Sequence, residues 1–484
     1  MNARGAFAMP SALALGLCAA LALDGCMVGP NYKAPPVPAP PAFSDQGHYG
    51  DWAAAQPADT ANRGAWWDLY RDPELDGLEV QCATANQSIA AALHAYEQAH
   101  DLVQENRAQL YPMVSIGGSA MRNRVSGNTP LSGSSAPQSF WDFLIPLNIS
   151  WEPDLWGAIR RQIESSTANA QASAADLANT QLSLQGLLAV TFFQLRGLDL
   201  QAQLLRTTLD AYSKTLDLTQ GLLKGGLSTQ LDVDAATAQL EATRPQLIDL
   251  GVQRAQYEHA IAVLVGVPAT GFHIAERPLT GTPPIVPTGI PSELLERRPD
   301  VAAAERRVAV ANALIGVAQS AYYPNVTLGA SGGLQSSRIG QLFTANSAQC
   351  NAGPSASELL YDAGLRKAQV EYAIAQREQA TALYREQVLS AFRDVEDQLA
   401  ALRVLEQEAI VQQRAVDAAQ RSTQLSTLRY KRGLAAYIEV LTYQTVELAD
   451  ERTAASLTAQ RIVASAQLQL ALGGGWSATQ LPSN

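Results

Sequence analysis

Two stretches of the chain repeat each other and decide its fold: Tyr111-Pro112-Met113-Val114-Ser115-Ile116-Gly117 and Tyr323-Pro324-Asn325-Val326-Thr327-Leu328-Gly329. They lie 212 residues apart (324 − 112). A helical pattern precedes each stretch, at about 85–110 and about 299–321, and the proline ends the helix because it pushes the preceding residue toward extended geometry. Alternating apolar residues then predict a strand. Each stretch therefore marks a junction between a helix and a strand.

The similarity continues downstream at an offset of 207 residues (433 − 226). Glycines of the two copies coincide at three places: Gly157 with Gly364, Gly226 with Gly433, and Gly266 with Gly473. The match needs no gap over about 110 positions, which is the mark of an internal duplication. Because the offset falls from 212 to 207, the first copy has five extra residues (212 − 207). Such insertions belong in exposed loop tips.

Each copy predicts a β-hairpin followed by two helices. In the first copy, a Gly/Ser/Asn/Pro cluster over 126–137 separates the first strand from a second alternating run over 143–151. Strands of about 10 residues suffice to cross a bilayer. Proline-free helical runs follow at 158–223 and 365–431, and each would reach roughly 100 Å.

Glycine turns at 225–226 and 433 then reverse the chain into return helices, at about 229–265 and 436–472. The fold class is therefore mainly α with membrane β-strands, in two tandem helix–β-hairpin–long helix–helix repeats.

Four membrane-length strands in one chain cannot close a barrel. An open sheet edge in lipid leaves backbone groups unpaired, at several kcal/mol for each, and the smallest single-chain barrels use about 8 strands. The chain must therefore oligomerise. The same rotation axis would carry the long helices into a ring, so the pattern predicts a duct.

The N-terminus predicts a signal peptide over residues 1–25. Arg4 is followed by an apolar stretch that ends at Leu23-Asp24-Gly25-Cys26. This ending resembles a bacterial lipobox, in which Cys26 is lipidated. An ordinary signal peptide or a lone membrane helix is the alternative, although Pro10 and Asp24 disfavour a spanning helix. Proline-rich residues 26–65 are expected to form an extended, lipid-anchored tether.

Composition narrows the class of function. Only 16% of residues are charged and the net charge is −11, which argues against nucleic acid as a partner. Cys82 and Cys350 have no spacing partner, and we expect them to be isolated and packed, with a disulfide as the alternative. The histidines show no metal-ligand spacing, so neither a metal nor any cofactor beyond a covalent lipid on Cys26 is expected.

Candidate catalytic patterns have simpler explanations. Residues 329–333 match G-x-S-x-G, but a nucleophile elbow needs a strand-to-helix turn and these residues lie within a proposed strand. The acidic cluster at 394–397 is expected on a solvated or tunnel-lining helix face, and Arg297-Arg298 is expected to pair with carboxylates. We therefore predict that the chain is not an enzyme.

Four motifs carry a family resemblance. They are Trp66-Trp67-Asp68-Leu69-Tyr70-Arg71-Asp72-Pro73-Glu74-Leu75, Leu294-Leu295-Glu296-Arg297-Arg298-Pro299-Asp300-Val301, Ala391-Phe392-Arg393-Asp394-Val395-Glu396-Asp397 and Ala471-Leu472-Gly473-Gly474-Gly475-Trp476. From Cys26 to Trp476 the chain resembles the lipoprotein (NodT-type) branch of the TolC-like outer-membrane efflux family. The chain then divides into a first repeat (66–266), a linker (267–298), a second repeat (299–476) and a tail (477–484).

The resemblance implies a homotrimer in the outer membrane, anchored there by lipid, with a β-barrel of about 12 strands continued by a periplasmic α-helical barrel. It implies the exit channel of a tripartite pump for drugs or other small molecules. Its partners would be a periplasmic adaptor and an inner-membrane transporter, commonly proton-driven. By the same resemblance, adaptors dock at two tips: Lys224-Gly225-Gly226-Leu227-Ser228 and Arg432-Gly433-Leu434-Ala435-Ala436. A simple glycine helix stop is the alternative there.

The gate is where the sequence departs from the family. Relatives often close the channel with an Asp-Ala-Gln-Arg segment, which here reads Thr442-Tyr443-Gln444-Thr445. Arg429, Tyr430 and Glu439 remain nearby, so we expect a constriction formed by Arg429, Tyr430, Glu439 and Thr442. Held by tyrosine and weaker polar contacts, it should open more easily.

Two rival classes remain. A periplasmic adaptor also has a long helical hairpin, but a single one, which the tandem repeat excludes. The second rival class is a structural coiled-coil lipoprotein that lies in the outer membrane and forms no pore. This class leaves the two β-hairpins unexplained.

Overall fold

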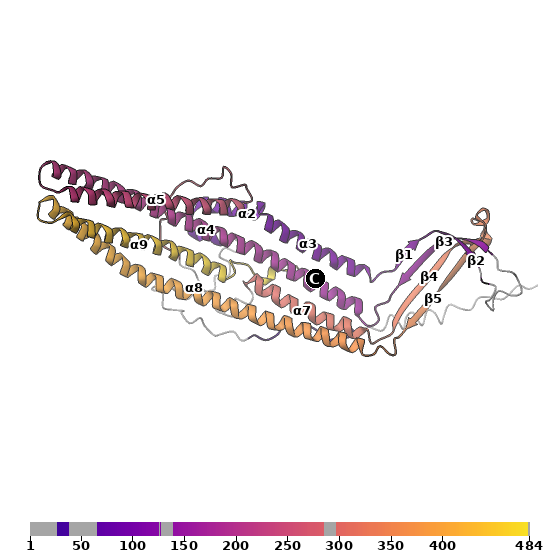
Figure 1. Cartoon of the computed structure of the whole chain (residues 1–484). Helices are drawn as coiled ribbons and strands as arrows, with labels where there is room; N and C mark the ends of the chain where they lie inside the picture. The colour runs from indigo at the N-terminus through magenta and orange to yellow at the C-terminus, as the bar shows by residue number, and fades with distance from the viewer. Residues whose placement is uncertain (1–26, 38–64, 125, 127–138, 285–296, 483–484) are drawn as a thin grey trace, which may run out of the picture.

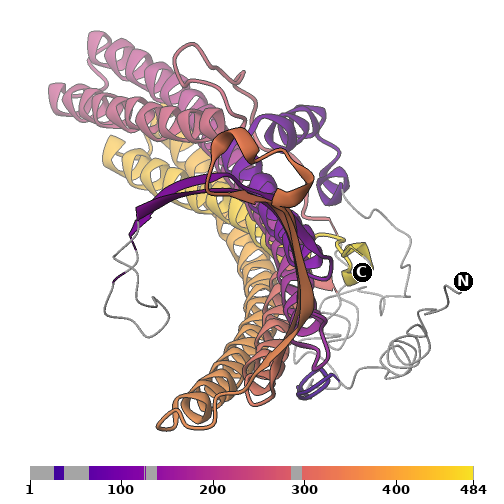
Figure 2. The same cartoon turned by 90° about the vertical axis from the view of Figure 1, so that its right-hand side faces the viewer.

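The computed structural model describes residues 27–37, 65–124, 126, 139–284 and 297–482. Long helices run side by side into one antiparallel sheet at the end of an elongated body (Figure 1). Viewed toward that end, sheet and helices follow one crescent-shaped arc (Figure 2). The body therefore has a concave and a convex side along its whole length.

Helices supply most of the structure. The first repeat contains η1 (Trp66–Tyr70), α2 (Pro73–Ala85), α3 (Gln87–Ala108), α4 (Ala158–Lys224) and α5 (Gln230–Leu264). The second repeat contains α7 (Pro299–Ser320), α8 (Leu365–Lys431) and α9 (Tyr437–Ala471). Helices α4 and α8 each have 67 residues and begin at the residues predicted from the sequence. None of the helices in the described part of the chain is both long and apolar enough to cross a membrane.

The six glycines aligned by the duplication all have positive φ, between 70° and 91°. They flank or separate the long helices of each repeat. Two of them also lie against another backbone: a Cβ on Gly266 would lie 2.3 Å from the Ala85 carbonyl oxygen, and one on Gly473 would lie 2.1 Å from the Arg297 carbonyl oxygen. The duplication is therefore confirmed in the backbone conformation itself.

The sheet contains β1 (Met113–Ile116), β2 (Ser119–Arg124), β3 (Ser139–Trp151), β4 (Asn325–Ser336) and β5 (Ala348–Ser357). Both predicted hairpins are present, and β3 pairs with β4 to join the repeats. The predicted first strand is interrupted at 117–118, although β1 and β2 keep one register against β3. Gly117 donates to the carbonyl of Pro146 at 3.0 Å, but Pro146 has no N–H to return, which weakens the ladder at that point.

The hydrophobic core lies where the helices of both repeats meet. Trp66 and Trp67 of the opening motif are 3% and 7% exposed and pack with Phe192 and Leu188 of α4. A second cluster joins α7, α8 and α9 around Val388 and Leu399. Burial of these large apolar side chains, at about 25 cal/mol per Å², holds the helices in their curved array.

Two predictions about single residues had different outcomes. Ser331 lies inside β4, which runs on to Ser336, so the interpretation of 329–333 as a strand is confirmed. Both cysteines are free, and Cys82 is buried as expected, but Cys350 is exposed. The expectation of packing was wrong for Cys350 because β5 is an edge strand in this sheet.

Candidate functional site: the two-faced sheet and the helical tips

The two faces of the sheet differ in chemistry. Directly paired residues of an antiparallel sheet share a face, and successive residues alternate. The register Ile149↔Val114 and Ile149↔Ala330, with Leu147↔Ile116 and Leu147↔Gly332, places these residues on one face. That face is apolar along the sheet, formed mainly by Val114, Ile116, Trp141, Phe143, Ile145, Leu147, Ile149, Leu328, Ala330, Leu334, Cys350 and Ala352.

The opposite face carries most of the polar side chains. It includes Ser115, Asn148, Ser150, Thr327, Ser331, Gln335, Asn351 and Ser355. Two hydrogen bonds link strands across it: Thr327 to Ser355 at 2.6 Å, and Gln335 Nε2 to Asp142 Oδ1 at 2.9 Å. One side of the sheet suits lipid and the other suits water.

Among the described residues of the single chain, neither edge of the sheet is paired with a further strand. The strand order ends with β1 and β2 on one side and β5 on the other. All ten residues of β5 are exposed. An edge strand presents unpaired N–H and C=O groups, so the sheet is complete only when further strands join it.

The first tip (residues 224–228) joins α4 to α5. Leu227 N donates to Leu222 O at 2.9 Å, and Gly226 N donates to Leu223 O at 2.9 Å. These two bonds satisfy carbonyls at the helix end in the Schellman pattern. A capping box then starts α5, since Thr229 and Asp232 exchange side-chain and backbone bonds.

The second tip (residues 432–436) repeats this backbone pattern. Leu434 N donates to Arg429 O at 2.9 Å. Helix α9 then begins after Ala436, which forms no side-chain cap. Each tip exposes two apolar side chains that the 207-residue offset relates: Leu227 and Leu231 in the first, 78% and 76% exposed, and Leu434 and Ile438 in the second, 66% and 64% exposed.

Three of the predicted gate residues, Arg429, Tyr430 and Glu439, lie beside the second tip, and Thr442 follows on α9. Arg429 donates to Glu439 at 2.9 Å, with both side chains partly exposed. Tyr430 is only 5% exposed. It lies edge-on to Tyr437, with ring centroids 5.5 Å apart. Thr442 is exposed and donates to the Ile438 carbonyl of its own helix at 2.8 Å.

The two helical hairpins, α4–α5 and α8–α9, contact each other through residues of which the sequence had not singled out Tyr212. The Tyr430 hydroxyl lies 3.1 Å from Ser228 Oγ of the first tip. Farther along the helices, the Tyr212 hydroxyl donates to the Gln444 carbonyl at 3.1 Å. Gln444 belongs to the segment that departs from the family pattern, and it is buried. The tyrosines therefore join α8 and α9 to α4 and its tip.

The first described residues, 27–37, lie against α4 and α7. Arg161, 2% exposed, donates Nε to the Val28 carbonyl at 3.0 Å and Nη2 to the Gly29 carbonyl at 3.1 Å. Asn312 donates to the Pro30 carbonyl at 2.8 Å, and the Tyr32 hydroxyl donates to Glu305. Residues 27–37 contain no helix or strand, and they are docked on the helices. Cys26 lies outside the described residues.

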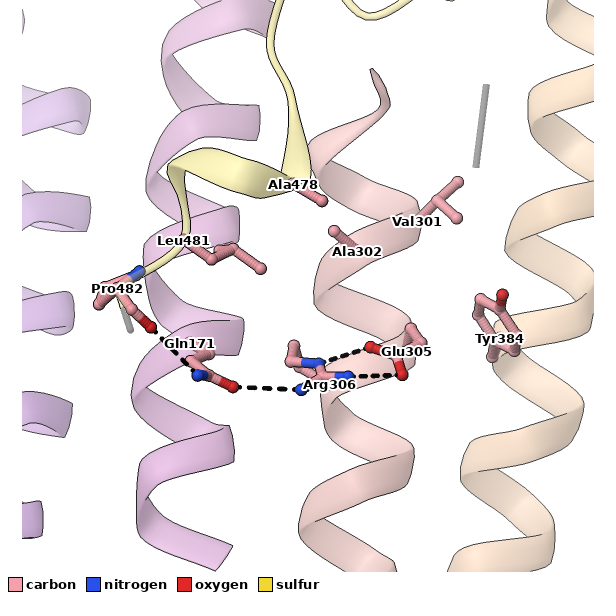
Figure 3. A pocket seen from close by; sticks show the side chains of 9 residues that line it. All are labelled: Gln171, Val301, Ala302, Glu305, Arg306, Tyr384, Ala478, Leu481 and Pro482. Atoms are coloured by element: carbon pink, nitrogen blue, oxygen red, sulfur yellow. Dashed lines mark hydrogen bonds and ion pairs between the residues drawn. The ribbon is translucent and has the colours of Figure 1, made fainter. Parts of the chain in front are cut away.

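The C-terminal tail reaches the same region. It borders a cavity of about 380 Å³ between α4 and α7. Figure 3 shows Gln171 of α4 between Pro482 and Arg306. Gln171 donates to the Pro482 carbonyl at 3.1 Å and accepts from Arg306 at 3.3 Å. Segments from both ends of the described chain therefore brace α7.

A buried charge network stabilises the first repeat. Arg196, 2% exposed, donates to Asp199 at 3.1 Å and contacts Glu74. Arg254 donates to the same Asp199 at 2.8 Å and to Glu258 at 2.6 Å. Buried charges are tolerated when they are paired in this way.

Elsewhere, Arg298 donates to Asp300 at 2.7 Å and to Asp394 at 3.3 Å, so the predicted pairing with carboxylates is confirmed for Arg298. Asp394 is thus engaged rather than simply solvated. Within the described ranges, no group of three or more His, Cys, Asp or Glu residues could hold a metal ion.

An arched sheet with one apolar face and open edges, continued by helices about 100 Å long, defines a membrane-inserted duct protein. The family model "Outer membrane efflux protein" matches residues 80–267 and 290–474. The chain belongs to this outer membrane efflux protein family.

Particular relatives agree with this assignment. The chain is 30% identical over 429 residues to the pyoverdine export outer membrane protein OpmQ of Pseudomonas aeruginosa, covering 88% of this chain and 90% of OpmQ. It is 28% identical over 472 residues to the toluene efflux pump outer membrane protein TtgF of Pseudomonas putida, covering 96% of each. The solved outer-membrane channel OprN matches with a TM-score of 0.84 and 29% identity, over 93% of this chain and all of OprN. The chain is therefore an outer-membrane exit channel of an efflux pump, and its family consists of transport channels rather than enzymes.

Proposed function

We propose that three copies of the chain form a lipid-anchored duct that passively conducts drugs or other small molecules from a periplasm-spanning pump to the exterior. The observation that carries this proposal is the two-faced sheet with two open edges. Counting β1 and β2 as one strand, the sheet has four strands, so three copies would supply 12 (3 × 4). Closure would pair every edge, which a bilayer requires. The concave helices would continue the pore.

The docked N-terminal segment supports the proposed lipid on Cys26. Val28 N donates to the Trp156 carbonyl at 3.1 Å, and Met27 lies against Gly157, where a Cβ would come within 2.9 Å of the Met27 Cα. Both contacts lie at the junction between the sheet and α4. A lipid chain on the preceding residue would then enter the membrane beside the sheet, and apolar burial favours anchoring by about 0.8 kcal/mol per CH₂.

The tips are proposed to receive a periplasmic adaptor that couples the duct to an inner-membrane, proton-driven transporter. The exposed pairs Leu227/Leu231 and Leu434/Ile438 support this because exposed apolar patches commonly mark protein contacts. OpmQ and TtgF are named as outer-membrane components of export or efflux systems.

The gate is proposed to lie beside the second tip, formed by Arg429, Tyr430 and Glu439, with Thr442 farther along α9. In this arrangement Tyr430 connects the α8–α9 hairpin to Ser228 of the first tip, while the ion pair of Arg429 and Glu439 holds α8 and α9 together. Opening then separates α8 and α9 from the first hairpin. If Glu439→Ala and Tyr430→Ala both leave single-channel conductance unchanged, this gate is wrong.

Mass and conductance together test the duct. Protein extracted from outer membranes in mild detergent should have the mass of three lipidated chains and should form channels in planar bilayers. The rival function, a structural coiled-coil lipoprotein without a pore, predicts no conductance in any oligomeric state. A monomer without conductance would overturn the proposal.

A further inference from the structure

The end of the sheet farthest from the helices carries an excess of positive charge. Arg122 and Arg124 lie on β2, and Arg338 follows β4 at the same end; all three are exposed. The sequence between β2 and β3, residues 125–138, contains no charged residue. The acidic residue of this region, Asp142, accepts a hydrogen bond from Gln335 on the opposite, polar face.

Two of these arginines lie on the apolar face. The register pairs Arg122 with Trp141 and Arg124 with Ser139. Trp141 stacks with Phe143 of the same face, with ring centroids 5.6 Å apart. The Arg122 guanidinium lies 5.9 Å from the centre of the Trp141 ring. The face that suits lipid therefore ends in a rim of tryptophan and arginine.

The arginines at the other end of the sheet have a different environment. There Arg160 donates to Asp154 at 3.0 Å, and Arg366 donates to Asp362 at 2.6 Å. By contrast, Arg122 and Arg124 form no ion pair with any described carboxylate. The charge at the outer rim is thus available to an external anion, whereas the charge near the helices is neutralised within the chain.

We propose that Arg122, Arg124 and Arg338 bind the phosphate groups of anionic lipids in the outer leaflet of the membrane. This inference rests on the proposed function, because it requires the sheet to cross the bilayer. Aromatic residues sit at the level of the headgroups, and arginine forms strong charge-assisted bonds with phosphate. Because residues i and i+2 of a strand are about 7 Å apart, Arg122 and Arg124 can contact neighbouring phosphates of one headgroup or of adjacent lipids.

The test measures how many lipids the detergent-extracted full-length protein retains. Native mass spectrometry is recorded after titration with bis-phosphorylated lipid A, and in parallel with phosphatidylcholine. Arg122→Gln/Arg124→Gln/Arg338→Gln is expected to lose affinity for lipid A by about tenfold or more, because each basic residue near a membrane surface strengthens the binding of anionic lipid. Replacing the same three arginines by lysine should retain much of the binding.

A matched control removes three charges from the helices: Arg206→Gln/Lys214→Gln/Arg244→Gln. These side chains are 52%, 73% and 57% exposed, and their loss should leave lipid A binding unchanged. Planar-bilayer conductance of every variant separates this proposal from the duct. The lipid site alone would be overturned if the channels conduct normally but the wild type and the glutamine variant bind lipid A equally. Normal conductance with phosphatidylcholine bound as tightly as lipid A would overturn it too. Absence of conductance in the wild type would overturn the duct.

Discussion

The first repeat is held by buried charges and capped helix ends, whereas the corresponding charges of the second repeat are looser and more exposed. In the first, Arg254 donates to Asp199 at 2.8 Å and Asp199 is 3% exposed. Their counterparts at the 207-residue offset are Arg461 and Glu406, which lie 3.9 Å apart with Glu406 45% exposed. Duplication has therefore preserved residue types while the environment around them has changed.

The tips show the same difference. Thr229 caps α5 through a capping box, but Ala436 at the corresponding position in α9 has no side-chain cap. Instead, Arg429 and Glu439 form a partly exposed ion pair there. We infer that the first hairpin serves as a fixed frame and that the second hairpin moves against it. The following variants test this contrast, from the largest expected effect to the smallest.

Arg196→Met should destabilise the protein most. It removes the buried partner of Glu74 and one of the two arginines that pair with the buried Asp199, and breaking a buried pair in this way costs about 3–5 kcal/mol. Arg403→Met, the counterpart in the second repeat, should cost roughly 1 kcal/mol because Arg403 is only half-buried. Denaturant unfolding of both variants in detergent measures the difference. Equal losses of unfolding free energy in the two variants would contradict the contrast between the repeats.

Glu79→Gln should change the pH dependence of stability. Glu79 is fully buried on α2, and neither carboxylate oxygen has a hydrogen-bond partner in the described structure. Burial, with Asp76 nearby, raises the pKa of Glu79 from 4.5 to about 9. Folding therefore favours the protonated acid, so the contribution of Glu79 to stability is greatest below about pH 4.5 and falls as pH rises toward 9.

Glutamine should remove this dependence and stabilise the protein by roughly 3 kcal/mol at pH 8. Thermal unfolding of both proteins between pH 5 and 9 gives the readout. If the unfolding temperatures of wild type and variant change with pH in parallel, Glu79 does not titrate as described.

Thr229→Ala and Ala436→Ser should have opposite effects. Loss of an N-cap costs about 1 kcal/mol, so the first variant should raise hydrogen exchange at the start of α5. The second variant supplies a cap to α9 and should slow exchange there. The prediction fails if adding serine leaves α9 unchanged while removing threonine loosens α5.

Arg429→Gln should have the smallest effect on stability, about 0.2–1 kcal/mol, because the Arg429–Glu439 pair is partly exposed. Its effect should appear in gating instead: a higher open probability at low salt, and convergence with wild type as salt screens the pair. Single-channel recordings at two salt concentrations measure this. An effect that grows with salt would argue against the ion pair.

Much of the fold could be predicted from periodicity and from the glycine register. The boundaries of α4 and α8 followed from a proline-free pattern and from glycines at both ends. Burial of Tyr430 and docking of residues 27–37 could not be predicted, because both depend on contacts between segments about 200 residues or more apart: Tyr430 with Ser228, and Tyr32 with Glu305. Exposure of Cys350 likewise depends on which strand lies at the sheet edge. Lipidation of Cys26 and docking at the tips stay predictions.

The claim that the sheet separates lipid from a water-filled pore is tested most directly by cysteine accessibility in the assembled channel. Ala330 and Ser331 are neighbours on β4, yet their paired residues place them on opposite faces. Each is replaced by cysteine in a Cys350→Ser background, and a charged, membrane-impermeant thiol reagent is added during conductance recording. Ser331→Cys should react and lose conductance, while Ala330→Cys should not react. Equal reaction at both positions, or reaction at Ala330→Cys alone, would contradict the duct.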